Sequence, residues 1–254
     1  MSDRSFRPLW AVLMVIAVNA AANIVPLGGY NTGQLSAMNP TGFTPSGWVF
    51  GIWGLIYLGL LAFGMAAAFG PPRIRSRIAA IAGPFYLNAL GNAAWIFVWH
   101  ARTVAVSMAV MLVILATLIV IFRRLRAMSA PTAGEFLAVD GVFSLYFGWI
   151  STATLVNFAA LCFNWKWYPF GLAMDQWALV SVCAATAIYA WMGGVTRDAV
   201  YCGVFVWAAY GVSVGPPDIT APVRLAGATG AAAVAAVLLW TLFNPGRRAT
   251  LRGH

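Results

Sequence analysis

The sequence predicts an all-α protein, a polytopic membrane helical bundle of about eight transmembrane helices. Its composition is the first reason: 62% of the 254 residues are hydrophobic, only 8% are charged, and the mean hydropathy is +0.83. A soluble globular domain does not have this composition. The second reason is a series of apolar stretches, each long enough to cross a bilayer as a helix. The third is an alternation of basic residues between successive connections.

The apolar stretches follow one another along nearly the whole chain. Each run is continuous rather than alternating, and backbone polar groups in lipid must be satisfied within the segment, so helices are favoured over a barrel. The predicted helices lie near residues 9–27, 46–68, 78–99, 103–122, 135–163, 174–194, 198–214 and 221–243.

The basic residues predict the orientation. Twelve lie at the termini or in the second, fourth and sixth connections, whereas Arg102, Lys166 and Arg224 lie on the opposite side. The positive-inside rule then places both termini in the cytoplasm. The twelve are Arg4, Arg7, Arg73, Arg75, Arg77, Arg123, Arg124, Arg126, Arg197, Arg247, Arg248 and Arg252.

The net charge of +9 is explained by this topology and by contact with anionic lipid headgroups. We therefore expect membrane lipids and no nucleic acid among the partners. The expected location is a bacterial inner membrane, with the chain as a multi-pass protein.

Residues for catalysis are few. The sequence shows no Ser-His-Asp arrangement, phosphate loop or metal-binding cluster, so we expect neither catalytic nor metal-ligating residues, and an enzyme is the less favoured class. Asp140 is the one acid expected at membrane depth. We expect it to form an ion pair with an arginine, in view of the nearby cluster Arg123 to Arg126; a functional acid is the alternative.

Three predicted helices carry aromatic residues and amides at helical spacing. The amides are expected to point into the bundle, because an unpaired amide in hydrocarbon is costly; there they bond to other helices or to a ligand. The alternative is that these residues only pack helices together. The candidate ligand-binding residues are Phe50, Trp53 and Tyr57 in the second helix, Asn88, Asn92 and Trp95 in the third, and Tyr146, Trp149 and Asn157 in the fifth.

Two further features concern access and packing. The loop Gly28 to Pro45 is uncharged and rich in Gly, Asn and Pro, which is compatible with a lid over a site or with a simple tether. Gly227 and Gly230 give the eighth helix a small-residue surface that permits close helix packing or a homodimer.

Residues 1–165 resemble the tryptophan-rich sensory protein family, also called TspO or translocator protein. Thr44 to Tyr57 is similar to its loop-to-second-helix motif, a Pro-rich entry followed by Phe, Trp and Tyr. Asn88 to Trp95 is similar to its third-helix pattern, with Asn88 where the family usually has Gln. Tyr146 to Ser151, continuing to Asn157, is similar to its fifth-helix pattern. Pro45-Ser46 departs from the family's doubled proline.

The resemblance implies a five-helix bundle over residues 1–165, followed by three additional helices and a basic cytoplasmic tail over residues 166–254. The family binds porphyrins, sterols and synthetic aromatic ligands in a cavity closed by the first loop. The expected function is therefore binding of a flat hydrophobic ligand in an aromatic-lined intramembrane pocket, for sensing, regulation or transport. No cofactor is expected to be required, although a tetrapyrrole is an expected ligand. The alternative is a non-catalytic pigment- or lipid-binding subunit of a larger membrane complex.

The charge alternation makes a prediction about topology. Single cysteines introduced at Thr32 and Ser76 should react with an impermeant thiol reagent from opposite faces of sealed vesicles, because the predicted second helix separates them. Labelling of both positions from one face would contradict the predicted orientation.

Overall fold

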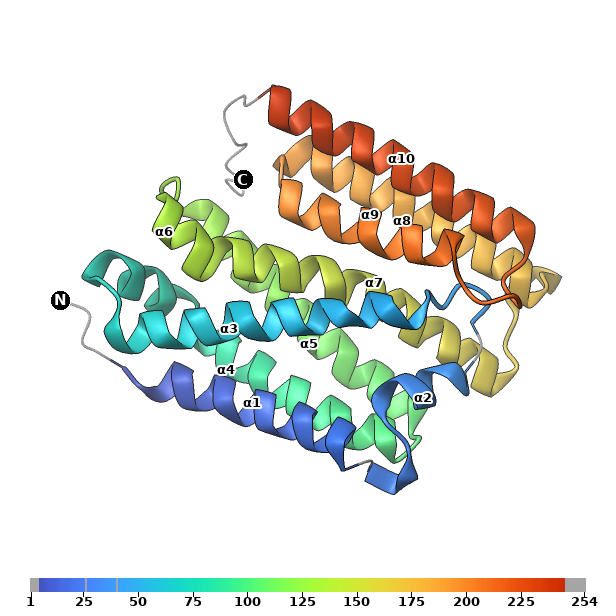
Figure 1. The fold of residues 1–254 in the computed structure, drawn as a ribbon, viewed down its shortest axis with the longest axis horizontal. Helices are drawn as coiled ribbons and strands as arrows, with labels where there is room; N and C mark the ends of the chain where they lie inside the picture. The colour runs from blue at the N-terminus through green and yellow to red at the C-terminus, as the bar shows by residue number, and fades with distance from the viewer. Residues whose placement is uncertain (1–4, 26, 40, 245–254) are drawn as a thin grey trace. The chain divides into compact units, whose positions relative to one another are not determined.

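The computed structural model describes residues 5–25, 27–39 and 41–244. These residues are helical or irregular and form no strand (Figure 1). Arg4 and the basic tail residues Arg247, Arg248 and Arg252 lie outside the described residues. The helices are α1 (Arg7–Ile24), α2 (Thr32–Ala37), α3 (Ile52–Phe69), α4 (Pro72–His100), α5 (Val104–Ala127), α6 (Ala133–Glu135), α7 (Gly141–Trp165), α8 (Met174–Thr196), α9 (Ala199–Ser213) and α10 (Ala221–Phe243). Four short turns are η1 (Leu27–Gly29), η2 (Gly47–Gly51), η3 (Phe136–Asp140) and η4 (Pro169–Gly171).

Seven helical stretches of the described chain are long and apolar enough to cross a membrane. α9 is also apolar but has only 15 residues. The predicted polytopic helical bundle is confirmed, and each of the eight predicted stretches overlaps either α9 or one of the seven observed stretches. The seven stretches are Arg7–Ile24, Gly47–Phe69, Pro72–His100, Val104–Ala127, Ala133–Trp165, Met174–Thr196 and Ala221–Phe243.

The described chain divides into two compact units. The first contains the residues up to Thr32 together with Ile52–Phe147; the second contains Gly33–Gly51 and the residues from Gly148 onward. This division differs from the predicted domain boundary after residue 165, which stays a prediction. α7 begins in the first unit and ends in the second.

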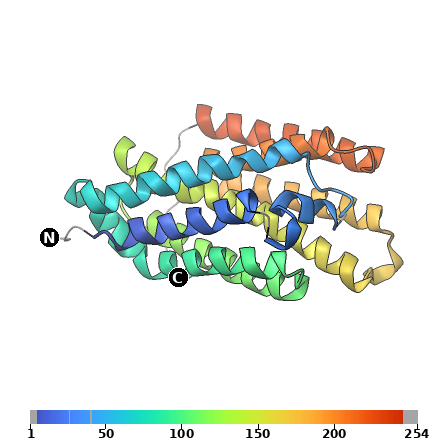
Figure 2. The ribbon, with the colours of Figure 1, turned by 60° about the horizontal axis from the view of Figure 1, so that its bottom comes forward.

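In the first unit, α4 packs along α5 and α1, and α1 also packs along α3 (Figures 1 and 2). Phe63 of α3 is fully buried at the centre of this unit. Its ring centroid lies 4.8 Å from that of Phe85 and 5.1 Å from that of Phe143. Aromatic pairs of this kind stabilise a core beyond their area burial.

A buried ion pair ties α4 to Asp140, the last residue of η3, in the first unit. The Arg77 side chain is 2% exposed, and its Nε and one terminal nitrogen donate to the two Asp140 oxygens at 2.7 and 2.8 Å. The guanidinium also donates to the carbonyls of Ser129 and Leu125, at and beyond the end of α5. The expected ion pair of Asp140 thus exists, but its arginine comes from α4 rather than from the nearby cluster Arg123 to Arg126.

The chain enters α7 through a capping box and a π-helical turn. The Glu135 carboxylate accepts from the backbone N–H and the hydroxyl of Thr132, and from Arg73 Nε at 2.7 Å. In η3, the backbone N–H of Gly141 then donates to the carbonyl of Phe136, five residues earlier. Such a turn holds one more residue than an α-helical turn.

In the second unit, α10 packs along α8 and α9, and small residues allow these helices to approach closely. A Cβ added at Gly227 would lie 2.9 Å from the carbonyl oxygen of Ala209, and one at Gly230 would meet the Thr186 hydroxyl. The small-residue surface expected on the last helix is therefore used within the chain.

Part of the predicted loop Gly28 to Pro45 is helical, because it contains most of η1 and all of α2. Its second half is packed within the second unit. The Asn39 side-chain oxygen accepts from Asn164 Nδ2 at 2.7 Å, Phe43 is 6% exposed, and the Ser46 N–H following the loop donates to the Gly211 carbonyl. Asn39, Phe43 and Ser46 thus anchor this part of the chain within the second unit.

Two adjacent glycines of α8 should respond oppositely to alanine. A Cβ at Gly193 would lie 2.5 Å from Cys202 Sγ and 2.8 Å from Val237, whereas one at Gly194 would meet nothing within 4 Å. Gly193→Ala should destabilise the protein by about 1–3 kcal/mol through overpacking. Gly194→Ala should be neutral or stabilising, since Ala favours the helix. Unfolding in mixed micelles measures both; equal effects would contradict this packing.

The ion pair of Arg77 with Asp140 should contribute more to stability than the neighbouring pair of Arg73 with Glu135. Arg77→Leu leaves the Asp140 carboxylate without its cation and should cost about 3–5 kcal/mol of stability. Arg73→Leu is the matched control: the Arg73 side chain is 62% exposed, and Glu135 keeps its bonds to Thr132, so a loss of about 1 kcal/mol or less is expected. Thermal unfolding in detergent compares the two, and similar losses would show that the Arg77 pair is not a specific clamp.

Candidate functional site

A chain of hydrogen bonds crosses three helices of the first unit. Asn19 of α1 donates through Nδ2 to Asn92 Oδ1 of α4 at 2.8 Å, and Asn92 Nδ2 donates to the Tyr146 hydroxyl of α7 at 2.7 Å. The exposed fractions of these side chains are 5%, 4% and 1%. Polar groups at this depth need partners within the protein, so the bonds position both Asn92 and Tyr146.

An aromatic face lies beside the Tyr146 end of this chain. Trp53 stacks on Tyr57, one turn later in α3, with ring centroids 5.4 Å apart, and its indole also meets the Tyr146 ring at 5.9 Å in an edge-to-face arrangement. Trp53 and Tyr57 are half-buried, whereas Tyr146 is buried. The structure therefore brings together four of the candidate residues: Trp53, Tyr57, Asn92 and Tyr146.

Two other candidates on α4 lie in different surroundings. Asn88 Nδ2 donates to Thr117 Oγ1 at 2.9 Å and to the Ile114 carbonyl at 3.2 Å, so this amide ties α4 to α5. Trp95 is half-buried and stacks on Trp99 with ring centroids 5.3 Å apart. Asn88 thus has a packing role whether or not it also contacts a ligand.

The remaining candidates belong to the second unit. Phe50, in η2, meets Trp149 of α7 edge to face with ring centroids 5.8 Å apart. Trp149 and Asn157 are both 3% exposed. Every candidate residue on α7 is therefore buried.

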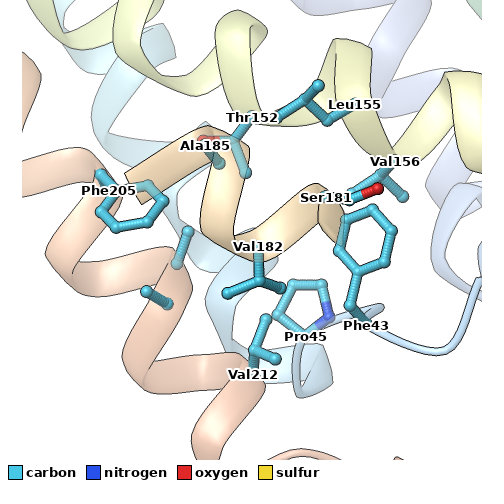
Figure 3. A pocket seen from close by; sticks show the side chains of 12 residues that line it. Phe43, Pro45, Thr152, Leu155, Val156, Ser181, Val182, Ala185, Phe205 and Val212 are labelled. Atoms are coloured by element: carbon cyan, nitrogen blue, oxygen red, sulfur yellow. The ribbon is translucent and has the colours of Figure 1, made fainter. Parts of the chain in front are cut away.

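The second unit also contains a small apolar cavity of about 30 Å³ (Figure 3). Figure 3 shows Phe43 and Pro45 approaching it from the segment before η2, Thr152 and Val156 from α7, and Val182 from α8. Its hydroxyls have partners: Thr152 pairs with the Tyr189 hydroxyl at 2.9 Å, and Ser181 donates to the Trp177 carbonyl. A space of this size and polarity accommodates a methyl or methylene group rather than a ring system. The other residues that line it are Leu155, Ser181, Ala185, Phe205, Ala208, Ala209 and Val212.

Sequence reasoning missed Asn19 and the lining of this cavity. Asn19 could have been found, because an amide in the middle of an apolar stretch is itself a signal for an interhelical bond. The cavity has no such signal, since its alanines and valines occur throughout the chain.

The described residues hold no arrangement typical of a metal site. No group of three or more His, Cys, Asp or Glu residues is close enough to hold an ion. Glu135 and Asp140 are both engaged by arginines. The chemistry available around Trp53 and Tyr146 is aromatic stacking and neutral hydrogen bonding.

Long apolar helices, tied together by buried amides and by a buried ion pair, define an integral membrane protein of the polytopic helical class. Within this class the chain belongs to the family described as TSPO-like protein, whose model matches residues 6–242. The match continues past residue 165, so α8, α9 and α10 lie inside the region shared with the family. No curated protein and no solved structure matches the chain.

Proposed function

We propose that the protein binds a flat hydrophobic ligand, a tetrapyrrole or a sterol-like molecule, against the aromatic face formed by Trp53, Tyr57 and Tyr146. The observation that carries the proposal is the half-buried Trp53–Tyr57 stack beside a buried tyrosine whose hydroxyl is held by Asn92. Half-buried rings offer a surface for stacking, while the amide and hydroxyl offer orientation. Trp95, which belongs to the same unit, is proposed to extend the ligand contacts, as the family resemblance implies.

The proposed role is sensing, regulation or transport of this ligand in a bacterial inner membrane, with both termini in the cytoplasm. Binding rather than catalysis is proposed, because the polar groups beside the aromatic face are neutral amides and hydroxyls. No resident cofactor is required in this scheme.

A second candidate function is that of a lipid- or pigment-binding subunit in a larger membrane assembly. The apolar cavity of the second unit favours it, since a narrow space lined by Phe43, Val182 and Val212 can take the methyl end of an acyl chain but not a macrocycle. Recovery of a defined complex from mild detergent would support this role. A chain that purifies alone and still binds a tetrapyrrole would favour the first.

The proposed site predicts the effect of removing its indoles. Trp53→Ala and Trp95→Ala should each weaken binding of protoporphyrin IX roughly fivefold, because loss of a stacked ring costs on the order of 1 kcal/mol. Titration of the porphyrin absorbance in detergent measures this effect. Trp191→Ala is the control, since Trp191 is 65% exposed in α8. If all three variants bind as the parent protein does, the aromatic face only packs helices.

A further inference from the structure

The hydrogen-bond chain of the first unit has a fixed direction. Asn19 Nδ2 donates both to Asn92 Oδ1 at 2.8 Å and to the carbonyl of Val15, one turn earlier in α1, at 2.9 Å. A backbone carbonyl can only accept. The nitrogen of the Asn19 amide must therefore face Val15, and the reversed orientation would place two acceptors against each other.

The orientation of the Asn19 amide fixes that of the Asn92 amide, which in turn fixes the role of the Tyr146 hydroxyl. Because the Asn19 nitrogen needs an acceptor, the oxygen of Asn92 faces α1 and its nitrogen faces α7. The Tyr146 oxygen therefore accepts from Asn92 Nδ2 at 2.7 Å, and its own hydrogen must point elsewhere.

The Tyr146 hydroxyl hydrogen has no acceptor among the described residues, although the side chain is only 1% exposed. A buried donor without an acceptor is costly, and in native proteins such a group usually has a partner that is a ligand, an ion or a water. The Trp53 ring, at 5.9 Å from the Tyr146 ring, places this donor beside the aromatic face.

We infer that the Tyr146 hydroxyl recognises a hydrogen-bond acceptor on the ligand, and that Asn19 is a positioning residue that makes Tyr146 a donor. The inference rests on the proposed function and narrows its ligand class. The ligand carries a carbonyl or carboxylate oxygen at the edge that faces Tyr146. A ligand that offers only N–H or O–H groups at that edge meets a donor and is disfavoured.

Three flat tricyclic compounds of similar size test this ligand class. Fluorenone carries a carbonyl oxygen, fluorene carries no polar atom, and carbazole carries an N–H donor. The parent protein should bind fluorenone roughly fivefold more tightly than fluorene, the usual net effect of one hydrogen bond, and more tightly than carbazole. The carbonyl stretch of bound fluorenone should lie at lower frequency than that of the free compound in hydrocarbon.

Two variants separate the donor from the residue that orients it. Tyr146→Phe keeps the ring, and should bring the fluorenone-to-fluorene affinity ratio near one and remove the shift of the carbonyl stretch. Asn19→Leu frees the Asn92 amide to turn and accept from Tyr146, so the preference for fluorenone over carbazole should fall. Asn23→Leu is the matched control, because Asn23 donates only to the Asn19 carbonyl in the same helix; its ratios should equal those of the parent protein.

The outcomes distinguish the inference from the proposed function. Equal affinity for fluorenone and fluorene, in binding that Trp53→Ala weakens, would overturn the inference and leave the proposed function in place. Failure to bind protoporphyrin IX and all three tricyclic compounds would refute both. A preference for fluorenone lost in Tyr146→Phe but unchanged in a folded Asn19→Leu variant would overturn the role of Asn19. The shift of the carbonyl stretch is measured on the parent protein, so it tests the hydrogen bond to the ligand even if a variant fails to fold.

Discussion

Hydrocarbon offers no partner for a hydrogen bond, and this constraint governs where each polar side chain of the protein lies. The buried amides of Asn19, Asn88 and Asn92 each bond to another helix, as Asn88 does with Thr117, and Asn19 also bonds to the backbone of its own helix at Val15. The hydroxyls of Thr154 and Ser181 donate to carbonyls four residues earlier in the same helix. In a water-soluble protein these groups would have solvent as an alternative. Here the bonds themselves determine which helices lie together.

The same constraint explains why much of the fold could be predicted from the sequence. A span must be apolar over a known length, so the eight stretches and the inward position of Asn92 and Asn157 follow from composition and spacing. The partner of Asp140 could not be predicted in this way. Arg123 to Arg126 are closer to Asp140 in sequence, but the arginine that reaches it is Arg77 of α4. The Arg77 guanidinium also donates to the backbone carbonyls of Leu125 and Ser129, at and beyond the end of α5. Which cation reaches a buried acid depends on helix packing.

The candidate site, too, could be predicted only in part from the sequence. Residue type and helical spacing identified the aromatic residues of α3 and α7 as candidate ligand contacts. The structure places two of them, Trp53 and Tyr146, edge to face. Spacing could not reveal that Asn88 bonds to α5, because the position of an amide on its own helix does not show which neighbouring helix supplies its hydrogen-bond partner. Nor could it reveal the cavity of the second unit, which arises from the shapes of ordinary apolar side chains around Phe43.

The π-helical turn before α7 has a consequence for the evolution of this helix. A single residue added to a helix rotates everything after it by about 100°. The turn Phe136–Asp140 absorbs one such residue, so the stretch from Gly141 onward keeps the angular position that brings Tyr146 to Asn92. Loss of one residue from this turn would restore regular α-helix and leave Tyr146 facing Asn92, whereas loss of one residue between Gly141 and Tyr146 would carry Tyr146 about a quarter of the way around the axis. The turn therefore lets the chain gain or lose one residue before α7 without changing which side chains α7 presents to its neighbours.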